Sequence, residues 1–190
     1  MEKKTNQGVA ATFRSKGYAS HIHLKGDGCD YSFADLPAIL RVLLLQDGTV
    51  TKTLEAYFWE PVKIDRLEQK VAPLSDSSKL PGTPAETEVL HRTVGISGIQ
   101  SIRQYCRATS LIRLDLLPDS VASQLVAGTI GIGELLRDKG LETYRELSDL
   151  FVARSRSGDV QIARCYLVYI HQQAAISITE FFPLAAYRAK

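Results

Sequence analysis

Two charged residues in apolar, strand-like segments, Glu180 and Arg92, are the first candidates for chemistry. Residues 174–183 are rich in β-branched and aromatic side chains and end at a proline, which predicts a β-strand. Because alternate side chains of a strand share a face, Glu180 falls on the more apolar face, between Ile178 and Phe182. A carboxylate there is costly unless it is paired, protonated or in contact with a ligand. A plain salt bridge, or an edge strand with Glu180 in water, is the structural alternative.

Arg92 shows the same anomaly in a second predicted strand, residues 88–96. Its neighbours on the same face are all aliphatic: Leu90, Val94 and Ile96. A guanidinium offers a planar fork that fits one carboxylate of a ligand. Two structural alternatives stay open. The stem of Arg92 could pack while its head reaches water, or Arg92 could simply pair with Glu180.

A histidine pair near the N-terminus is the only other hint of a reactive site. His21 and His23 form an H-x-H pattern, and Cys29 follows, so zinc binding is conceivable. A fourth ligand is not evident and the spacing matches no standard site, which favours solvent-facing histidines. Residues 131–133 form a Gly-x-Gly, but the third glycine and the preceding strand–turn of a dinucleotide site are missing. We therefore expect neither a metal nor an organic cofactor.

The composition describes an ordinary globular protein. The 190 residues are 45% hydrophobic and 23% charged, with a net charge of +2 and no dense basic block, which argues against a nucleic-acid partner. The longest apolar run, around residues 43–45, is far too short to span a membrane. The polar start, residues 1–25, predicts no signal peptide. Three widely spaced cysteines (Cys29, Cys106, Cys165) are typical of free thiols, so we expect a cytoplasmic protein.

The first half of the chain predicts helices followed by strands. Residues 1–35 are mixed and polar and form an extension whose order the sequence leaves open, while residues 36–190 form the main domain. A helical hairpin is expected over residues 36–59, a strand over 62–71 with Val62, Ile64 and Leu67 inward, and a Pro/Ser/Gly-rich loop over 72–85. The strand at 88–96 then turns into a return strand at 101–114.

The second half predicts two short helices and a closing hairpin. Residues 119–126 form the first helix, and the second ends at Gly140. Residues 141–154 are amphipathic and ambiguous between helix and strand. Residues 160–170 form a strand, residues 171–173 a turn, and residues 174–183 the partner strand. This order predicts an α+β fold with an antiparallel sheet and helices packed on one face.

Six short motifs together resemble a known family, the chorismate pyruvate-lyase superfamily, in its cyanobacterial, plastid and mycobacterial branch. The resemblance covers about residues 36–183. The motifs are LLQDGTVT (44–51), LHRTV (90–94), SLIRLDLLP (110–118), IGELL (132–136), LETYRE (141–146) and ITEFFP (178–183). Each motif is weak alone, but six in the same order are fairly specific.

The resemblance implies an activity and a set of site residues. The family cleaves chorismate into 4-hydroxybenzoate and pyruvate without a metal or organic cofactor, on a chorismate lyase-like antiparallel sheet with flaps over the product. Carried over to this chain, the arginine that binds the ligand carboxylate is Arg92, and the carboxylate near the ring hydroxyl is Glu180. Ile132 would be the flap residue against the ring, and Val50 a contact from a helical flap. Gly131 departs from the family, where a proline commonly precedes the flap residue.

Further candidates complete the expected binding set. Arg113 and, more weakly, Arg107 could hold the second carboxylate of chorismate, although exposed basic residues would look the same. Thr179, next to Glu180 in the same strand, is added as a contact. A carboxyl group in an apolar wall has a raised pKa and can act as an acid. Glu180 fits that role or the reciprocal role of a base, and the sequence does not choose.

Two other functions stay open on the same fold. Ligand-sensing domains of bacterial transcription regulators share it, but they normally follow a helix-turn-helix domain, and the roughly 35 residues before the core show no such pattern. The chain could also act on another enolpyruvyl ether, or yield another hydroxybenzoate isomer. The sequence leaves the oligomeric state undetermined.

Overall fold

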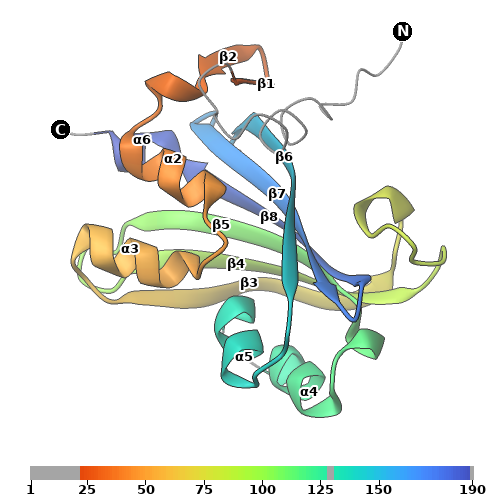
Figure 1. The fold of residues 1–190 in the computed structure, drawn as a ribbon. Coiled ribbons are helices and arrows are strands. Elements are labelled where there is room, and N and C mark those ends of the chain that lie inside the picture. Colours follow the sequence, from red (N-terminus) through yellow and green to blue (C-terminus); the bar gives the residue numbers. More distant parts are fainter. Residues whose placement is uncertain (1–21, 128–130, 189–190) are drawn as a thin grey trace, which may run out of the picture.

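The computed structural model describes residues 22–127 and 131–188, and its centre is a six-stranded antiparallel sheet (Figure 1). The strand order is β3-β4-β5-β8-β7-β6. The strands are β3 Val62–Pro73, β4 Glu88–Gly98, β5 Gln104–Ile112, β6 Tyr144–Arg154, β7 Val160–Ile170 and β8 Gln173–Pro183. Two local hairpin series, β3-β4-β5 and β6-β7-β8, are joined by the β5–β8 pairing.

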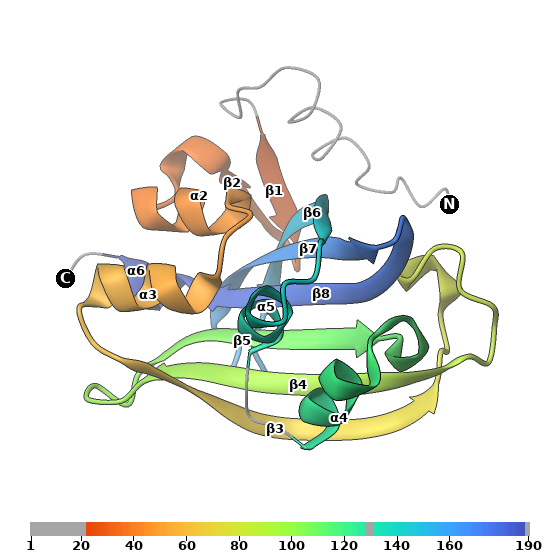
Figure 2. The ribbon, with the colours of Figure 1, turned by 60° about the horizontal axis from the view of Figure 1, so that its bottom comes forward.

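Four helices lie on one face of this sheet, which we call the inner face (Figure 2). They are α2 Ala38–Leu45, α3 Val50–Phe58, α4 Asp119–Ala127 and α5 Ile132–Asp138. A short α6, Leu184–Tyr187, follows β8, and single 3-10 turns occur at η1 Phe33–Asp35, η2 Ser77–Lys79 and η3 Leu114–Leu116. The predicted α+β class, with an antiparallel sheet covered by helices on one face, is confirmed.

The described part of the N-terminal segment packs into the main core. Strands β1 (His23–Gly26) and β2 (Cys29–Ser32) form a small antiparallel pair beside β6. Ile22, Leu24 and Phe33 are buried in the cluster that also holds α2 and α3. Residues 22–35 therefore share one core with the residues that follow.

Two separate apolar cores cover the inner face and leave a gap between them. The first joins α2, α3 and α6 to inward residues of the sheet, among them Ile96, Ile162 and Phe182. The second joins α4 and α5 to another set, including Leu90, Ile112 and Ile176. Burial of these side chains fixes both helix pairs on the sheet. The strip of sheet between the two cores is where polar inward residues occur.

The opposite, outer face is covered by a loop at one end. In residues 74–87, Leu74 and Leu80 pack on Val89, Leu167 and Ala174, which point outward from the sheet. Most of the predicted loop 72–85 is irregular, although β3 extends into it as far as Pro73.

Several predicted elements differ from the structure in instructive ways. Residues 144–154 of the ambiguous segment form a strand, β6. Leu67 is not inward as predicted: it is more than half exposed, because a β-bulge between Arg66 and Glu68 shifts the register of β3. The return strand begins at Gln104 and not at 101, since residues 99–103 form the turn from β4.

A buried carboxylate, Glu60, ties the end of α3 to the β4–β5 turn. Its oxygens accept hydrogen bonds from the backbone N–H groups of Gln100 (2.9 Å) and Ser101 (3.0 Å) and from the hydroxyl of Tyr105. The bond from Tyr105 and then those from Ser101 lower the pKa of the Glu60 carboxyl to about 2. This anchor holds together two turns that lie about 40 residues apart in the chain.

Within residues 22–127 and 131–188, no helix is long and apolar enough to cross a membrane.

Candidate active site

A cavity opens on the inner face between the two apolar cores. About 700 Å³ of space, with the open solvent at its mouth included, is free of protein atoms. The sheet forms its floor, and the N-terminal ends of α3 and α5 form its walls. Its charged lining residues are Arg92, Arg145, Glu180 and Glu134, with Tyr166 and Ser110 beside them.

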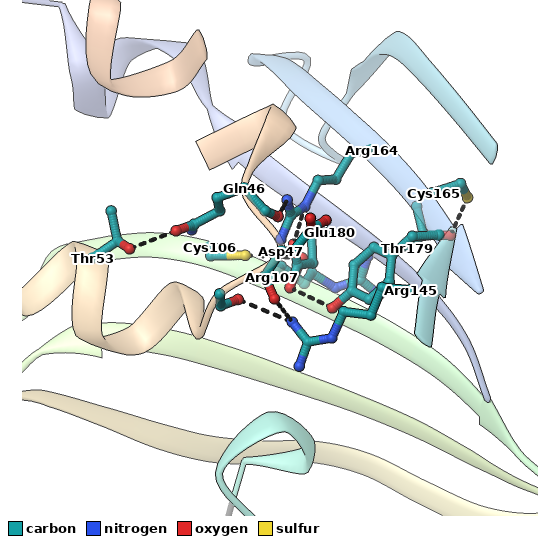
Figure 3. A network of polar contacts seen from close by, with 12 residues as sticks. Gln46, Asp47, Thr53, Cys106, Arg107, Arg145, Arg164, Cys165, Thr179 and Glu180 are labelled. Atoms are coloured by element: carbon teal, nitrogen blue, oxygen red, sulfur yellow. Dashed lines mark hydrogen bonds and ion pairs between the residues drawn. The ribbon is translucent and has the colours of Figure 1, made fainter. Parts of the chain in front are cut away.

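Glu180 lies on the cavity floor in a buried ion pair with Arg164 (Figure 3). The Arg164 Nε–H donates to Glu180 Oε2 at 2.6 Å, and the Tyr166 hydroxyl donates to Oε1 at 3.1 Å. The two charged side chains are 3% and 7% exposed. The expectation of an apolar wall around Glu180 is therefore wrong, because Arg164 projects from β7 directly opposite it.

Arg164 and Tyr166 are themselves fixed in place. A second guanidinium N–H of Arg164 donates to the Gln46 carbonyl at 2.8 Å, and the guanidinium lies 4.9 Å from the centre of the Tyr166 ring. Burial lowers the pKa of Arg164, but the Glu180 carboxylate and other neighbours raise it further, so the net direction is upward. Burial, and then the charge of Glu180, raise the pKa of Tyr166. Arg164 thus stays a cation and Tyr166 stays a neutral hydroxyl donor.

Arg92 reaches the same cavity from β4, as its strand alternation predicts. Its residue is 3% exposed, and the neighbouring β5 residue is Ser110. Burial, and then the nearby charge of Arg66, lower the pKa of Arg92. Both causes disfavour the charged form of Arg92, and a carboxylate bound beside it would favour that form. Arg92 and Glu180 are thus brought into one cavity, as predicted.

A second inward arginine, Arg145 of β6, stands at the cavity wall. One guanidinium nitrogen donates to the carbonyls of Asp47 (2.8 Å) and Gly48 (3.0 Å), and the group lies 5.9 Å from the centre of the Tyr166 ring. Arg145 therefore braces the loop that leads into α3 and presents positive charge to the cavity.

The N-terminus of α3 also contributes positive potential. Residues 48–51 line the cavity, and Val50 is the first residue of the nine-residue helix. Its N-cap, Thr49, makes no side-chain capping bond, so the first backbone N–H groups of α3 are left to other partners. The positive end of a helix dipole favours an anionic group placed there.

Ile132 and Val50, the two residues expected to lie in flaps, both line the cavity. Ile132 begins α5 and lines the cavity together with Gly131 and Gly133, and Val50 lines it from α3. The two helices are linked, since Arg137 of α5 donates to the Thr49 hydroxyl at 3.4 Å. Residues 128–130, which lead into α5, lie outside the described part of the chain.

Three expected binding residues lie elsewhere. Thr179 points to the outer face, because it is the immediate neighbour of Glu180 in an alternating strand, and its hydroxyl contacts the Cys165 thiol at 2.8 Å. Arg113 follows β5 and is engaged by Asp115, to which its Nε–H donates at 3.1 Å. Arg107 also faces outward and lies 5.8 Å from the centre of the Phe181 ring. None of the three lines the cavity.

The residues of the considered zinc site have other contacts. His23 Nδ1 lies 2.8 Å from the Asp30 carboxylate, and an N–H of Arg154 donates to Cys29 Sγ at 3.2 Å. His21 lies outside the described residues.

Sequence reasoning missed Arg164, Tyr166 and Arg145, although signals for two of them existed. Counting outward from the predicted turn at residues 171–173 places Arg164 opposite Glu180, which is the observed pairing. The same count places Tyr166 on the inner face with it. Arg145 could not be placed, since its segment was ambiguous between helix and strand.

Comparisons with known proteins agree with the resemblance in the sequence. A family model described as "Chorismate pyruvate-lyase Rv2949c-like" matches residues 44–190. A curated relative from Mycobacterium tuberculosis H37Rv, named chorismate pyruvate-lyase, is 27% identical over 173 residues, covering 84% of this chain and 86% of the relative.

Solved structures show the same fold at low identity. PhnF from Mycobacterium smegmatis superposes with a TM-score of 0.57 at 11% identity, over 76% of this chain and 67% of that chain. A GntR-family regulator from Bacillus cereus gives a TM-score of 0.53 at 12% identity, over 68% of this chain and 96% of that one. This likeness concerns the fold alone.

Proposed function

The chain belongs to the Rv2949c-like chorismate pyruvate-lyase family, and from this premise we propose that it cleaves chorismate to 4-hydroxybenzoate and pyruvate. The predicted family and the predicted lyase class are confirmed by the family match over residues 44–190. The observation that carries the specific reaction is the cavity itself. It combines an ionic carboxylate, Glu180, with two arginines that line the cavity, Arg92 and Arg145, and chorismate carries two carboxylates that such cations could bind.

The reaction asks little beyond orientation and one proton transfer. Chorismate loses a hydrogen from the ring carbon that bears its hydroxyl, and the bond from the adjacent ring carbon to the enolpyruvyl oxygen breaks. The ring becomes aromatic as 4-hydroxybenzoate, and the released enolpyruvate takes up the proton and becomes pyruvate. Since aromatisation makes the step favourable, holding the substrate in the reactive geometry can supply several kcal/mol of the barrier reduction.

Cationic groups of the cavity would bind the two carboxylates of the substrate. Arg92 is buried in the floor and would hold the ring carboxylate in its planar fork. Arg145 and the N-terminus of α3 lie on the wall and would hold the carboxylate of the enolpyruvyl group. Arg145 takes here the role that the sequence suggested for Arg113.

Glu180 would act as a base and as an acceptor for the ring hydroxyl. Both of its observed hydrogen bonds are donated to it, by Arg164 and by Tyr166, and this is the pattern of an ionised carboxylate. The ion pair fixes its orientation, as the third member of a catalytic group commonly does. Tyr166 is a neutral donor at the same site and would return the proton toward the leaving oxygen.

The α3 and α5 ends would enclose the ring during reaction. Ile132 and Val50 supply apolar surface against the ring, and both begin helices that converge over the cavity. Such enclosure excludes water from the elimination and makes release of the aromatic product a slow step.

Incubation of the purified protein with chorismate alone tests this function. We expect pyruvate and 4-hydroxybenzoate in equal amounts, separated by chromatography from the other hydroxybenzoate isomers, with no metal or nucleotide added. A different isomer, or pyruvate released from another enolpyruvyl ether only, would assign a different lyase reaction.

A non-catalytic sensor domain is the second candidate, and the likeness of the fold to regulators supports it. Under this alternative, hydroxybenzoate or chorismate would bind in the cavity, and chorismate would be recovered unchanged.

A further inference from the structure

The outer face of the sheet carries a row of polar side chains that the proposed reaction does not use. Directly opposed residues of successive strands form the row: Glu68, Thr93, Thr109, Thr179, Cys165 and Asp149. Opposed side chains on one sheet face lie within contact distance, so the row is a continuous polar ladder.

The ladder forms the floor of a second cavity, which we call the outer hollow. About 820 Å³ of it, the mouth included, is free of protein atoms. The ladder residues that line it are Glu68, Thr93, Thr109, Thr179 and Cys165, and the charged or basic residues beside them are Lys70, Lys79, His91 and Arg92. Lys79 comes from the turn η2, which lies over this end of the sheet with Leu80 buried beneath it. The hollow is therefore built from a fixed sheet and an anchored loop.

Donors dominate the middle of the hollow. Three threonine hydroxyls meet there, and each can donate one hydrogen bond. Nε2 of His91 is buried and makes no hydrogen bond within the part of the chain that the structure describes. Burial raises the pKa of the Cys165 thiol, and the hydrogen bond with Thr179 lowers it. The charge of Asp149 raises this pKa and that of Lys79 lowers it, so a carboxylate and an ammonium group both lie within electrostatic reach of the ladder. The carboxylates Glu68 and Asp149 stand at the two ends of the row.

We propose that the outer hollow binds a small oxyanion, a carboxylate or a phosphate, over Thr93, Thr109 and Thr179. The hydroxyls and the His91 ring would donate to its oxygens, and Lys79 would close over it as a charged lid residue. The hollow and the inner cavity lie on opposite faces of the sheet, and both are lined by Arg92 and Ser110. Thr93 follows Arg92, and Thr179 precedes Glu180, in the same strands.

Binding of simple anions to the whole protein tests the proposal without reference to turnover. Inorganic phosphate and acetate are titrated in separate arms, and binding is followed by calorimetry and by backbone amide shifts at Thr109 and Thr179. We expect saturable binding in one arm, and that arm identifies the anion. Lys79→Ala and Thr109→Val should each weaken it at least about tenfold, because each removes a hydrogen bond to a charged group.

Two control variants separate the outer hollow from the inner cavity and from general effects. Arg145→Ala removes a cation that lines the inner cavity and not the outer hollow, so it should leave the anion affinity unchanged, as should Thr143→Val, an exposed threonine outside the hollow. The proposal is overturned if neither anion saturates at millimolar concentration. It is also overturned if Arg145→Ala abolishes binding while Thr109→Val does not, because the anion would then occupy the inner cavity.

Discussion

At the residue scale, the central feature of the site is a buried carboxylate and the cation that pairs with it. Glu180 forms a buried ion pair with Arg164, and Arg92 lines the same cavity. The sequence left two interpretations of Glu180 open, a salt bridge and a position in a ligand cavity, and the structure combines them. Glu180 is salt-bridged, and the salt bridge orients it toward the cavity.

Arg164→Met should destabilise the protein by about 3–5 kcal/mol, because the carboxylate of Glu180 would stay buried without its cation. Unfolding in urea measures the change. Arg156→Met, at an exposed arginine in the β6–β7 turn, is the matched control and should be close to neutral. A small effect of Arg164→Met would mean that water or another cation compensates Glu180.

Arg92→Ala should mainly weaken ligand binding. Loss of a charge-assisted carboxylate pair costs roughly 1.5–3 kcal/mol, which corresponds to about a 10- to 150-fold weaker affinity for 4-hydroxybenzoate. Calorimetric titration measures the affinity, with Arg156→Ala as the charge-matched control. An unchanged affinity in a folded Arg92→Ala protein would remove Arg92 from the binding site.

Single residues were predictable where a charge sits on an apolar strand face, as Arg92 and Glu180 do. Arg164 escaped notice because its own strand is apolar on both faces, and only the hairpin register reveals its partner. Thr179 was assigned to the site through sequence adjacency to Glu180, although alternation places it on the other face.

At the element scale, the start of α5 lines one wall of the cavity. Gly131 has φ −70°, a conformation open to any residue, and an added Cβ would meet only the flexible end of Ile64. Gly140, just past the helix, has φ +64° and needs glycine. The two glycines that flank α5 therefore have opposite tolerance for substitution.

Gly131→Ala should slow product release, and Gly140→Ala should speed it. Alanine at a compatible position stabilises the ordered state by about 0.4–1 kcal/mol, so release should slow about two- to fivefold. At Gly140 the same change strains the end of α5 and favours the open flap. Stopped-flow displacement of bound 4-hydroxybenzoate measures both rates. Equal shifts in the same direction would show that α5 does not gate release.

The hydrogen bonds of Glu60 that connect the end of α3 to the β4–β5 turn should weaken in acid. The pKa of the Glu60 carboxyl is lowered from 4.5 to about 2 in the folded protein. Its contribution to stability is therefore complete above pH 4.5 and is lost progressively as the pH falls toward about 2. Free energies of unfolding from urea titrations at several acidic pH values should show a shallower pH dependence in Glu60→Gln. An identical pH dependence would exclude Glu60 as a source of acid sensitivity.

The helices and strands were predicted well where clear glycine or proline signals mark their ends. Strand β7 and the helix pair α2–α3 follow from hydrophobic periodicity and from glycine and proline signals. The segment that forms β6 could not be assigned, since its amphipathic pattern fits both a helix and a strand. For the same reason the position of Arg145 could not be predicted. Bulges in β3 and in the β7–β8 hairpin change which residues point to each face of the sheet, and residue spacing alone does not reveal them.

At the scale of the whole molecule, the class of fold was predictable but the strand order was not. Hairpins join neighbours in sequence, yet the site depends on the long-range β5–β8 pairing that sets Ala108 opposite Glu180. This pairing closes the sheet between the two apolar cores and leaves the polar strip as a cavity. It also creates the outer threonine ladder, which no local pattern indicates.

The most direct test of the account is the rate of pyruvate release from chorismate by the wild type and Glu180 variants. We predict that Glu180→Gln, with its ability to take a proton removed, is slower by about 10²-fold or more, the usual size of acid–base assistance. Glu180→Asp keeps the charge that faces Arg164, so it should melt near the wild type and still be slow. The exposed Glu88→Gln should keep the full rate. Near wild-type pyruvate release by a folded Glu180→Gln protein would contradict the central claim.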